Sequence, residues 1–313
     1  MELHDFCSTS RVVIVAGKGG VGKTTVTAAL ATAAARAGMS VLIVEVEGKS
    51  GLSTALGSPP LTYHEQETRP GLRVRTLTPD EALLEYLEDR GLRRVSKQLV
   101  KSGALDVVAT AVPGMKDILV LGKVKQLEQS GVADLILIDA PAAGHAITFL
   151  LSARGLLDAV RVGPVRKQAE DVIELLSDPA RCRVMLVTLP EETPVNELIE
   201  TAFALEDRVG VKLGPVVMNA VPEDLALVGS TAAQDASAAG IDSPPEQRAL
   251  DAAASFRHER HELAHEQCSR LASLLPLPQL RLPYVFGTIG PDEVERLADV
   301  LTNEITNLPA VPS

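Results

Sequence analysis

Nine residues, Gly17-Lys18-Gly19-Gly20-Val21-Gly22-Lys23-Thr24-Thr25, follow directly on the apolar run Val12–Ala16. They match G-x-x-x-x-G-K-[ST], the Walker A phosphate loop, in the strand–turn–helix setting that this motif requires. Glycines let successive backbone N–H groups converge on phosphate oxygens without clashes from Cβ atoms. The helix expected to begin near Lys23 points the positive end of its dipole at the same anion. The stretch therefore predicts that the chain binds a nucleoside triphosphate.

Two motifs indicate which residues contact the phosphates and which hold a metal ion. Lys23 is expected to reach the β and γ phosphates, and the Thr24 hydroxyl to complete the coordination shell of Mg²⁺. The run Leu135–Asp139 is an apolar strand that ends in an acid, which is the Walker B pattern. Asp139 is expected to face the crevice where open α/β sheets bind ligands, and to hold Mg²⁺ beside Thr24, directly or through a water molecule.

Short strand-like runs alternate with longer helical stretches along the whole chain. This is the βαβ pattern of a mostly parallel, twisted sheet with helices on both faces, so the sequence predicts an α/β P-loop NTPase fold. We expect strands at Val12–Ala16, Val41–Val46, Leu72–Leu77, Leu135–Ala140, Val184–Leu189, Val216–Ala220 and Leu280–Leu282. The second and fourth are nearly unbroken Val, Ile and Leu, as expected for strands buried on both faces.

The chain, residues 1–313, is interpreted as a single P-loop domain, because it contains no internal repeat. Two connections between strands are too long for simple crossovers and predict a helical insertion at about 78–133 and a smaller helical segment at about 152–181. The stretch 229–245 is rich in Ala, Ser, Gly and Pro and is expected to be a surface loop.

Composition excludes several classes of protein. The formal net charge is −11, and no basic stripe is present to neutralise nucleic-acid phosphates. No apolar run approaches the roughly 18–20 residues that span a bilayer, and the C-terminal region is acidic where a membrane-surface helix would be basic. The N-terminus lacks the features of a signal peptide, and three cysteines offer no disulfide framework. We therefore expect a cytoplasmic protein without direct membrane insertion or nucleic-acid binding.

The additional lysine of the loop, Lys18, indicates which class of P-loop protein this is. An ordinary P-loop needs nothing special at this position, but GKGGVGKT resembles the deviant Walker A motif of the ArsA, MinD, ParA and nitrogenase iron-protein superfamily. The resemblance implies that Lys18 crosses a dimer interface to the nucleotide of the partner. The working unit would then be a homodimer or a heterodimer with a paralogous ATPase. The alternative is a solvated lysine in a loop.

Within this superfamily, the chain is most similar to ArsA-type ATPases, the arsenite-pump and tail-anchored-protein-targeting enzymes. VLIVEVEG at Val41–Gly48, Pro113-Gly114, LIDAPAAGH and LPEETPVNEL at Leu189–Leu198 occur in the order found there, so the resemblance spans almost the whole chain. It implies a Mg²⁺-dependent ATPase that binds ATP and ADP. Gly144, in the segment that resembles switch II, would place a backbone N–H on the γ-phosphate. His145 would then either report the state of the switch or act as a structural cap.

The same resemblance implies how adenine is read. Asn219 ends a predicted strand where the family places an asparagine whose amide reads adenine, and an amide offers the donor and acceptor that the base requires. Pro283 matches the adenine-flanking loop of the family. The alternatives are a turn asparagine and an ordinary strand-ending proline.

The main departure from the family lies in switch I. Where relatives carry D-P-A-H, this chain has Glu47-Gly48-Lys49-Ser50, so Glu47 stands in place of the aspartate that orients the attacking water. The longer side chain matters, because a displacement of about 1 Å can cost on the order of 100-fold in rate. Glu45 is a reserve candidate. The rival interpretation is therefore a nucleotide-sensing, weakly hydrolysing subunit of a heterodimer.

Other features remain open. The chain lacks the C-x-x-C zinc clamp of targeting ATPases, and Cys7, Cys182 and Cys268 are too dispersed to predict a metalloid site. A protein client is possible, but no feature of the sequence singles one out. The run from His261 to His265 is a literal H-E-x-x-H, with His258 on nearly the same face. We interpret it as a solvated helix with an apolar seam through Phe256, Leu263 and Leu271, with an adventitious surface metal as the alternative.

Overall fold

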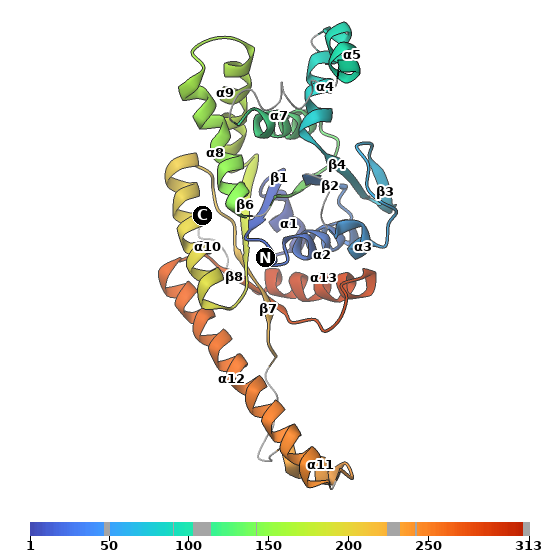
Figure 1. The fold of residues 1–313 in the computed structure, drawn as a ribbon, viewed down its shortest axis with the longest axis vertical. Coiled ribbons are helices and arrows are strands. Elements are labelled where there is room, and N and C mark those ends of the chain that lie inside the picture. The colour runs from blue at the N-terminus through green and yellow to red at the C-terminus, as the bar shows by residue number, and fades with distance from the viewer. Residues whose placement is uncertain are drawn as a thin grey trace.

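A computed structural model describes residues 1–46, 51–89, 91–102, 114–141, 143–223, 232–241 and 243–308. Its strands form one sheet in the order β3-β4-β2-β5-β1-β6-β7-β8 (Figure 1). All neighbouring strands pair in parallel except β3 and β4. The strands are β1 (Val12–Gly17), β2 (Val41–Val46), β3 (Gln66–Arg69), β4 (Leu72–Leu77), β5 (Leu135–Asp139), β6 (Cys182–Thr188), β7 (Val216–Val221) and β8 (Gln279–Pro283). The predicted α/β P-loop fold is confirmed.

Helices cover both faces of the sheet and enclose two apolar cores (Figure 1). One face is covered by α1 (Leu3–Ser8), α2 (Lys23–Arg36), α3 (Leu52–Leu56) and α13 (Pro291–Thr306). The other carries α4 (Pro79–Asp89), α7 (Met115–Ser130), α8 (Ala143–Ala159), α9 (Pro164–Ser177), α10 (Glu192–Ala204) and its π-helical extension η1 (Leu205–Val209). The remaining helices are α5 (Arg93–Ser102), α11 (Ala232–Ala238) and α12 (Pro244–Leu274).

Phe, Tyr and Trp make up only 3% of the sequence, and the core is built mainly from small and aliphatic side chains. Every residue of β2 and β5 is buried, as their Val/Ile/Leu sequence predicts for strands covered on both faces. In α2, the mostly small residues of Ala28–Ala34, five of them alanine, are buried between the sheet and α13. At the end of α2, Arg36 binds Asp299 of α13 at 2.6 Å. Small side chains thus let two helices lie close to one sheet face.

Two sequence expectations need correction. The edge strand β3 was not expected, because its sequence QETR is polar and only four residues long. The stretch 229–245 was expected to be a loop, but it contains α11, and α12 begins at Pro244. Alanine has the highest helix propensity, and proline is favoured at the first position of a helix. Both features favour helix over loop in this stretch.

The two long connections between strands contain helices in their described residues. Helices α4, α5 and α7 lie between β4 and β5, and α8 and α9 lie between β5 and β6. Helix α12 extends away from the sheet, with α11 beside its far end (Figure 1). Within the ranges that the model describes, no helix is both long enough and apolar enough to cross a bilayer.

Candidate functional site

The phosphate loop joins β1 to α2 at the carboxyl edge of the sheet. Gly17 ends β1 so close to β6 that a Cβ atom on it would lie 2.3 Å from the Val187 carbonyl oxygen. Gly19, Gly20 and Val21 form the turn, and Gly22 adopts a φ of 89° immediately before α2. Gly17 is thus required for space, and Gly22 for its backbone conformation. The loop therefore has the backbone form that the motif predicted.

Lys23 begins α2 and folds back over the loop. Its Nζ atom donates a hydrogen bond to the Lys18 carbonyl oxygen at 3.0 Å, and the residue is 9% exposed. Burial lowers the pKa of Lys23, while the negative charge of Asp139 acts in the opposite direction. A lysine held in this way is a nearly buried cation at the mouth of an anion-binding loop.

Thr24 and Asp139 bring the two motifs together. The Thr24 hydroxyl donates to Asp139 Oδ2 at 2.8 Å, and Asp139 is 3% exposed at the end of β5. Thr25 follows in the first turn of α2. A hydroxyl and a carboxylate in contact form an oxygen donor set that fits Mg²⁺, which binds through a few protein oxygens together with phosphates and water.

A second carboxylate lies on the neighbouring strand. Glu45 of β2 is in register with Asp139 of β5, and it is 3% exposed. Thr76 of β4 donates to Glu45 Oε2 at 3.0 Å. This carboxylate is therefore part of a buried network between β2 and β4. Glu47, expected to orient water, lies outside the described residues.

Asn219 is held against the phosphate loop. Its Nδ2 atom donates to the Val21 carbonyl oxygen at 2.9 Å. The same nitrogen would lie 2.1 Å from a Cβ atom on Gly22, so the amide fills the space that this glycine leaves. The structure therefore gives Asn219 a loop-bracing contact that the sequence did not indicate.

The backbone beyond Asn219 is distorted. Ala220 has a φ of 55°, and the pairing of β7 with β8 shifts register between Met218 and Val221. Pro283 ends β8 and pairs with Val221 across this irregularity. A non-glycine residue with positive φ stores strain that often accompanies function. Asn219 and Pro283 thus lie on adjacent strands at the same sheet edge.

Lys18 lies on the exposed side of the loop, and its partner is a residue that sequence reasoning missed. Its ammonium group forms an ion pair with Glu197 of α10. The Lys18 side chain is 52% exposed, and that of Glu197 is 31% exposed. Glu197 lies within the segment Leu189–Leu198 that resembles the family, but its contact with Lys18 depends on how α10 packs beside β6. Within one chain, the positive charge of Lys18 is therefore paired with the negative charge of Glu197.

Gly144 lies in the first turn of α8, directly after β5. His145 follows it in the same turn, as expected for a residue that opens a helix. The backbone of the segment that resembles switch II therefore begins a helix beside Asp139.

The dispersed cysteines do not converge. Cys7 belongs to the apolar core on one face of the sheet, whereas Cys182 and Cys268 belong to the core on the other face. Burial raises the pKa of Cys7 and Cys182 to about 12. Thiolates, which bind metal, are therefore disfavoured at both positions.

The H-E-x-x-H run lies on α12, as expected. The prediction that Phe256, Leu263 and Leu271 form its apolar face is correct only for Leu271. Phe256 and Leu263 are 60% and 59% exposed, whereas Leu271 is 1% exposed. The buried face of this part of the helix runs through Ala264, Cys268 and Leu271. His261 Nδ1 lies 3.1 Å from the Pro222 carbonyl oxygen. Within the described ranges, no group of three or more His, Cys, Asp or Glu residues is arranged to hold a metal ion.

A family model described as anion-transporting ATPase matches residues 10–162. The ATPase BagA of Mycobacterium tuberculosis is 32% identical over 94% of this chain and 93% of its own length. The chain belongs to the ArsA-type family of anion-transporting ATPases.

More distant relatives fit this family. A putative arsenical pump-driving ATPase of Halobacterium salinarum is 28% identical over 69% of this chain and 36% of its own length. The ATPase get3 of Schizosaccharomyces japonicus is 31% identical over 44% of this chain and 42% of its own length. The resemblance stated from the sequence is thereby confirmed at the level of the family.

Proposed function

We propose that this member of the family is a Mg²⁺-dependent ATPase that works as a nucleotide-switched dimer. The observation that carries the proposal is the hydrogen bond between Thr24 and Asp139, formed beside the nearly buried Lys23. It supports the proposal because two oxygen atoms that fit Mg²⁺ lie beside the loop cation. This is the arrangement that phosphoryl transfer requires, because catalysis there is mostly positioning and charge stabilisation.

Each residue then has a role toward the nucleotide. The backbone of Gly17–Thr25 cradles the phosphates of ATP or ADP, and Lys23 neutralises their charge. Thr24 and Asp139 hold Mg²⁺, which supplies charge neutralisation at the phosphates when it is bound. Glu47 orients the attacking water, and the Gly144 N–H contacts the γ-phosphate.

The base and the partner complete the proposal. Asn219 and Pro283 flank adenine at the ends of β7 and β8. Lys18 reaches the nucleotide of a second chain, either a copy or a paralogue. Nucleotide state would then control dimerisation, and a dimer could present a surface to a protein client.

Calorimetric titration of Mg-ATP tests the binding step. Lys23→Ala is expected to weaken affinity by about 100-fold or more, because a charge-assisted contact with phosphate is lost. Lys212→Ala is the matched control, since this exposed lysine precedes β7 at the opposite edge of the sheet. Equal affinity in wild type and Lys23→Ala would contradict the proposal.

The second candidate is a nucleotide-sensing subunit whose paralogue supplies hydrolysis. The substitution of D-P-A-H by Glu47-Gly48-Lys49-Ser50 favours it. Single-turnover hydrolysis separates the two candidates. A rate that falls in Glu47→Gln supports the ATPase, whereas turnover that requires an added paralogue supports the sensing subunit.

A further inference from the structure

A second polar site lies in the helical region, away from the phosphate loop. A cavity of about 220 Å³ is formed between α4, α7 and α9. Its floor is one stripe of α7, Leu119, Gly122, Gln126 and Gln129, which follow the spacing of a single helix face. The proposed nucleotide site uses none of these residues.

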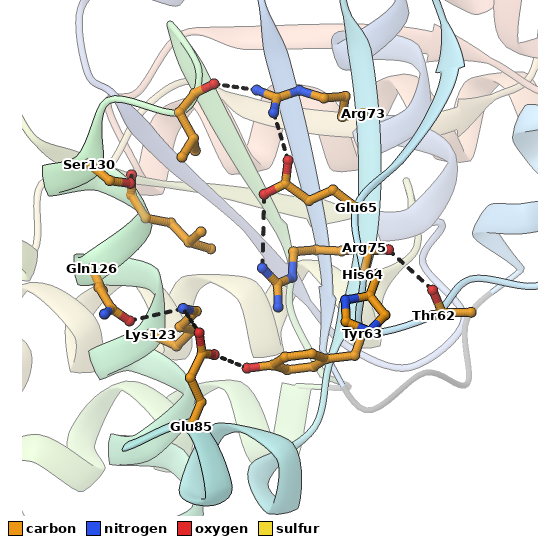
Figure 2. Close-up of polar contacts among 12 residues, drawn as sticks. Thr62, Tyr63, His64, Glu65, Arg73, Arg75, Glu85, Lys123, Gln126 and Ser130 are labelled. Carbon is orange, nitrogen blue, oxygen red and sulfur yellow. Dashed lines mark hydrogen bonds and ion pairs between the residues drawn. The ribbon is translucent and has the colours of Figure 1, made fainter. Parts of the chain in front are cut away.

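Two lysines give the cavity its charge. Lys123 and Lys125 both line it, and their side chains are only 11% and 15% exposed. Lys123 binds Glu85 Oε1 at 2.6 Å and Gln126 Oε1 at 2.9 Å, as Figure 2 shows. Lys125 binds Asp171 of α9 at 2.8 Å. Each lysine thus has one carboxylate partner, and the lining itself contains the two ammonium groups of Lys123 and Lys125 and the Glu85 carboxylate.

Three glutamine amides and a close contact between α7 and α9 form the rest of the polar lining of this cavity. Gln126, Gln129 and Gln168 contribute side-chain amides to the lining, and each amide can donate hydrogen bonds. Gly122 allows Gln168 to reach across from α9, since a Cβ atom there would lie 1.6 Å from Gln168 Nε2. The lining therefore offers several hydrogen-bond donors beside the Glu85 carboxylate, and Gln168 of α9 lies directly against α7 at Gly122.

An apolar chamber adjoins the polar end. A second cavity of about 140 Å³ shares Tyr86, Leu119 and Gln168 with the first, and its remaining lining is apolar. An apolar cavity of roughly 150 Å³ is large enough to accept a benzene ring. The two cavities together have one end suited to an anion and one suited to a ring or a short alkyl chain.

We propose that this paired cavity binds a small amphipathic carboxylate, with the carboxylate between Lys123 and Lys125 and the apolar part in the chamber lined by Leu83, Ile118 and Val165. A lysine ammonium has three donors, and Lys123 uses two of them on Glu85 and Gln126 in the hydrogen bonds described above. A carboxylate accepts the third. An amine of the same shape would meet the two ammonium groups and is expected to bind more weakly.

The network around Glu85 holds the polar end in place. Tyr63 donates to Glu85 from the loop before β3, and the Arg75 guanidinium lies 4.4 Å from the centre of the Tyr63 ring (Figure 2). Glu65 binds Arg73 at 2.6 Å and lies 3.9 Å from Arg75. Glu85 is thus fixed from the sheet side while Lys123 faces the cavity.

The test uses 3-phenylpropionate as the probe, with its neutral amide and the corresponding 3-phenylpropylamine as matched arms. Titration calorimetry on the full chain, with and without saturating Mg-ADP, should give a dissociation constant below about 1 mM for the carboxylate. The amide is expected to bind about tenfold more weakly, and the amine not measurably. Propionate, which lacks the ring, should lose most of the affinity.

Substitutions test where the probe binds. Lys123→Gln and Lys125→Gln should each weaken binding about tenfold, and Val165→Phe should block the chamber. The matched controls are Lys167→Gln and Val162→Phe. Lys167 binds Asp171 from the exposed side of α9, and Val162 is 82% exposed. Both controls should leave affinity unchanged. Lys125→Gln and Val165→Phe serve if Lys123→Gln does not fold.

Equal affinity for the three probes would overturn the proposal. Affinity unaffected by Lys125→Gln and Val165→Phe, or displacement of the probe by Mg-ADP, would also overturn it. Because binding is measured independently of ATP binding and turnover, failure here is distinguishable from failure of the proposed ATPase.

Discussion

Asp139 and Thr24 are the residues that the sequence placed most accurately. Their motifs lie far apart in the chain, yet each is tied to the carboxyl end of a buried strand, so the parallel fold brings them together at 2.8 Å. Glu197 and Ala220 were missed for a physical reason. A counter-charge on a packed helix and a strained turn both depend on tertiary geometry that no local pattern encodes.

Gly22 offers a sharp test at the scale of single atoms. Gly20 and Gly22 both have positive φ, at 83° and 89°, but nothing lies within 4 Å of the Cβ position at Gly20. Gly20→Ala should therefore cost only backbone strain, about 1–2 kcal/mol. Gly22→Ala adds a clash with Asn219 and should lower the free energy of unfolding by a further ~1–3 kcal/mol. Urea unfolding without nucleotide measures both.

Removing Asn219 provides the control for the clash. In Gly22→Ala/Asn219→Ala, the methyl group gains space, so the double variant should be more stable than the two single effects added together. A coupling energy near zero would show that Asn219 does not brace the loop.

At the scale of elements, hydrophobic patterning predicted the parallel strands well and the polar elements poorly. Strand β3 is a polar edge strand that depends on pairing with β4, so its own sequence carries little signal. The sequence predicted the C-terminal half of α12 as a helix, but it assigned two exposed residues to the buried face. Leu263 faces solvent because α12 turns a different face, through Ala264, Cys268 and Leu271, toward the rest of the protein.

Glu85 joins three elements and gives a pH dependence. Burial by itself raises the pKa of Glu85, but hydrogen bonds from Lys123 and Tyr63 outweigh it, and the pKa lies below its ordinary value of 4.5. A carboxyl with a lowered pKa in the folded state stabilises the protein above its unfolded pKa, and that contribution is lost as pH falls through the folded pKa.

Glu85→Gln should therefore lower the free energy of unfolding at pH 7, by about 1 kcal/mol for a partly exposed network. The difference from wild type should shrink as pH falls below about 4.5, the ordinary value of the group. Urea titrations between pH 7 and pH 3 measure it, with the exposed Glu262→Gln as control. A difference that stays constant over this range would contradict the assigned role of the ion pair.

At the scale of the whole molecule, one chain holds one phosphate loop, and Lys18 is the residue that connects this loop to a second chain in the proposed dimer. In the single chain, Lys18 is paired with Glu197, and both side chains are partly exposed. Exposed ion pairs are worth about 0.2–1 kcal/mol. Such a pair is weak enough to exchange for the phosphates of a partner, whose negative charge is larger and more concentrated.

Light scattering with an ATP analogue, with ADP and without nucleotide measures this exchange. Wild type should dimerise with the analogue and dissociate with ADP, because the γ-phosphate adds charge at the interface that Lys18 reaches. Lys18→Ala should stay monomeric in all three conditions, while Lys212→Ala behaves as wild type. Glu197→Gln removes the competing counter-charge, so the analogue concentration at half-dimerisation should fall by up to about fivefold. If wild type stays monomeric throughout, even with a paralogue added, then Lys18 is a loop lysine whose partner is Glu197 alone.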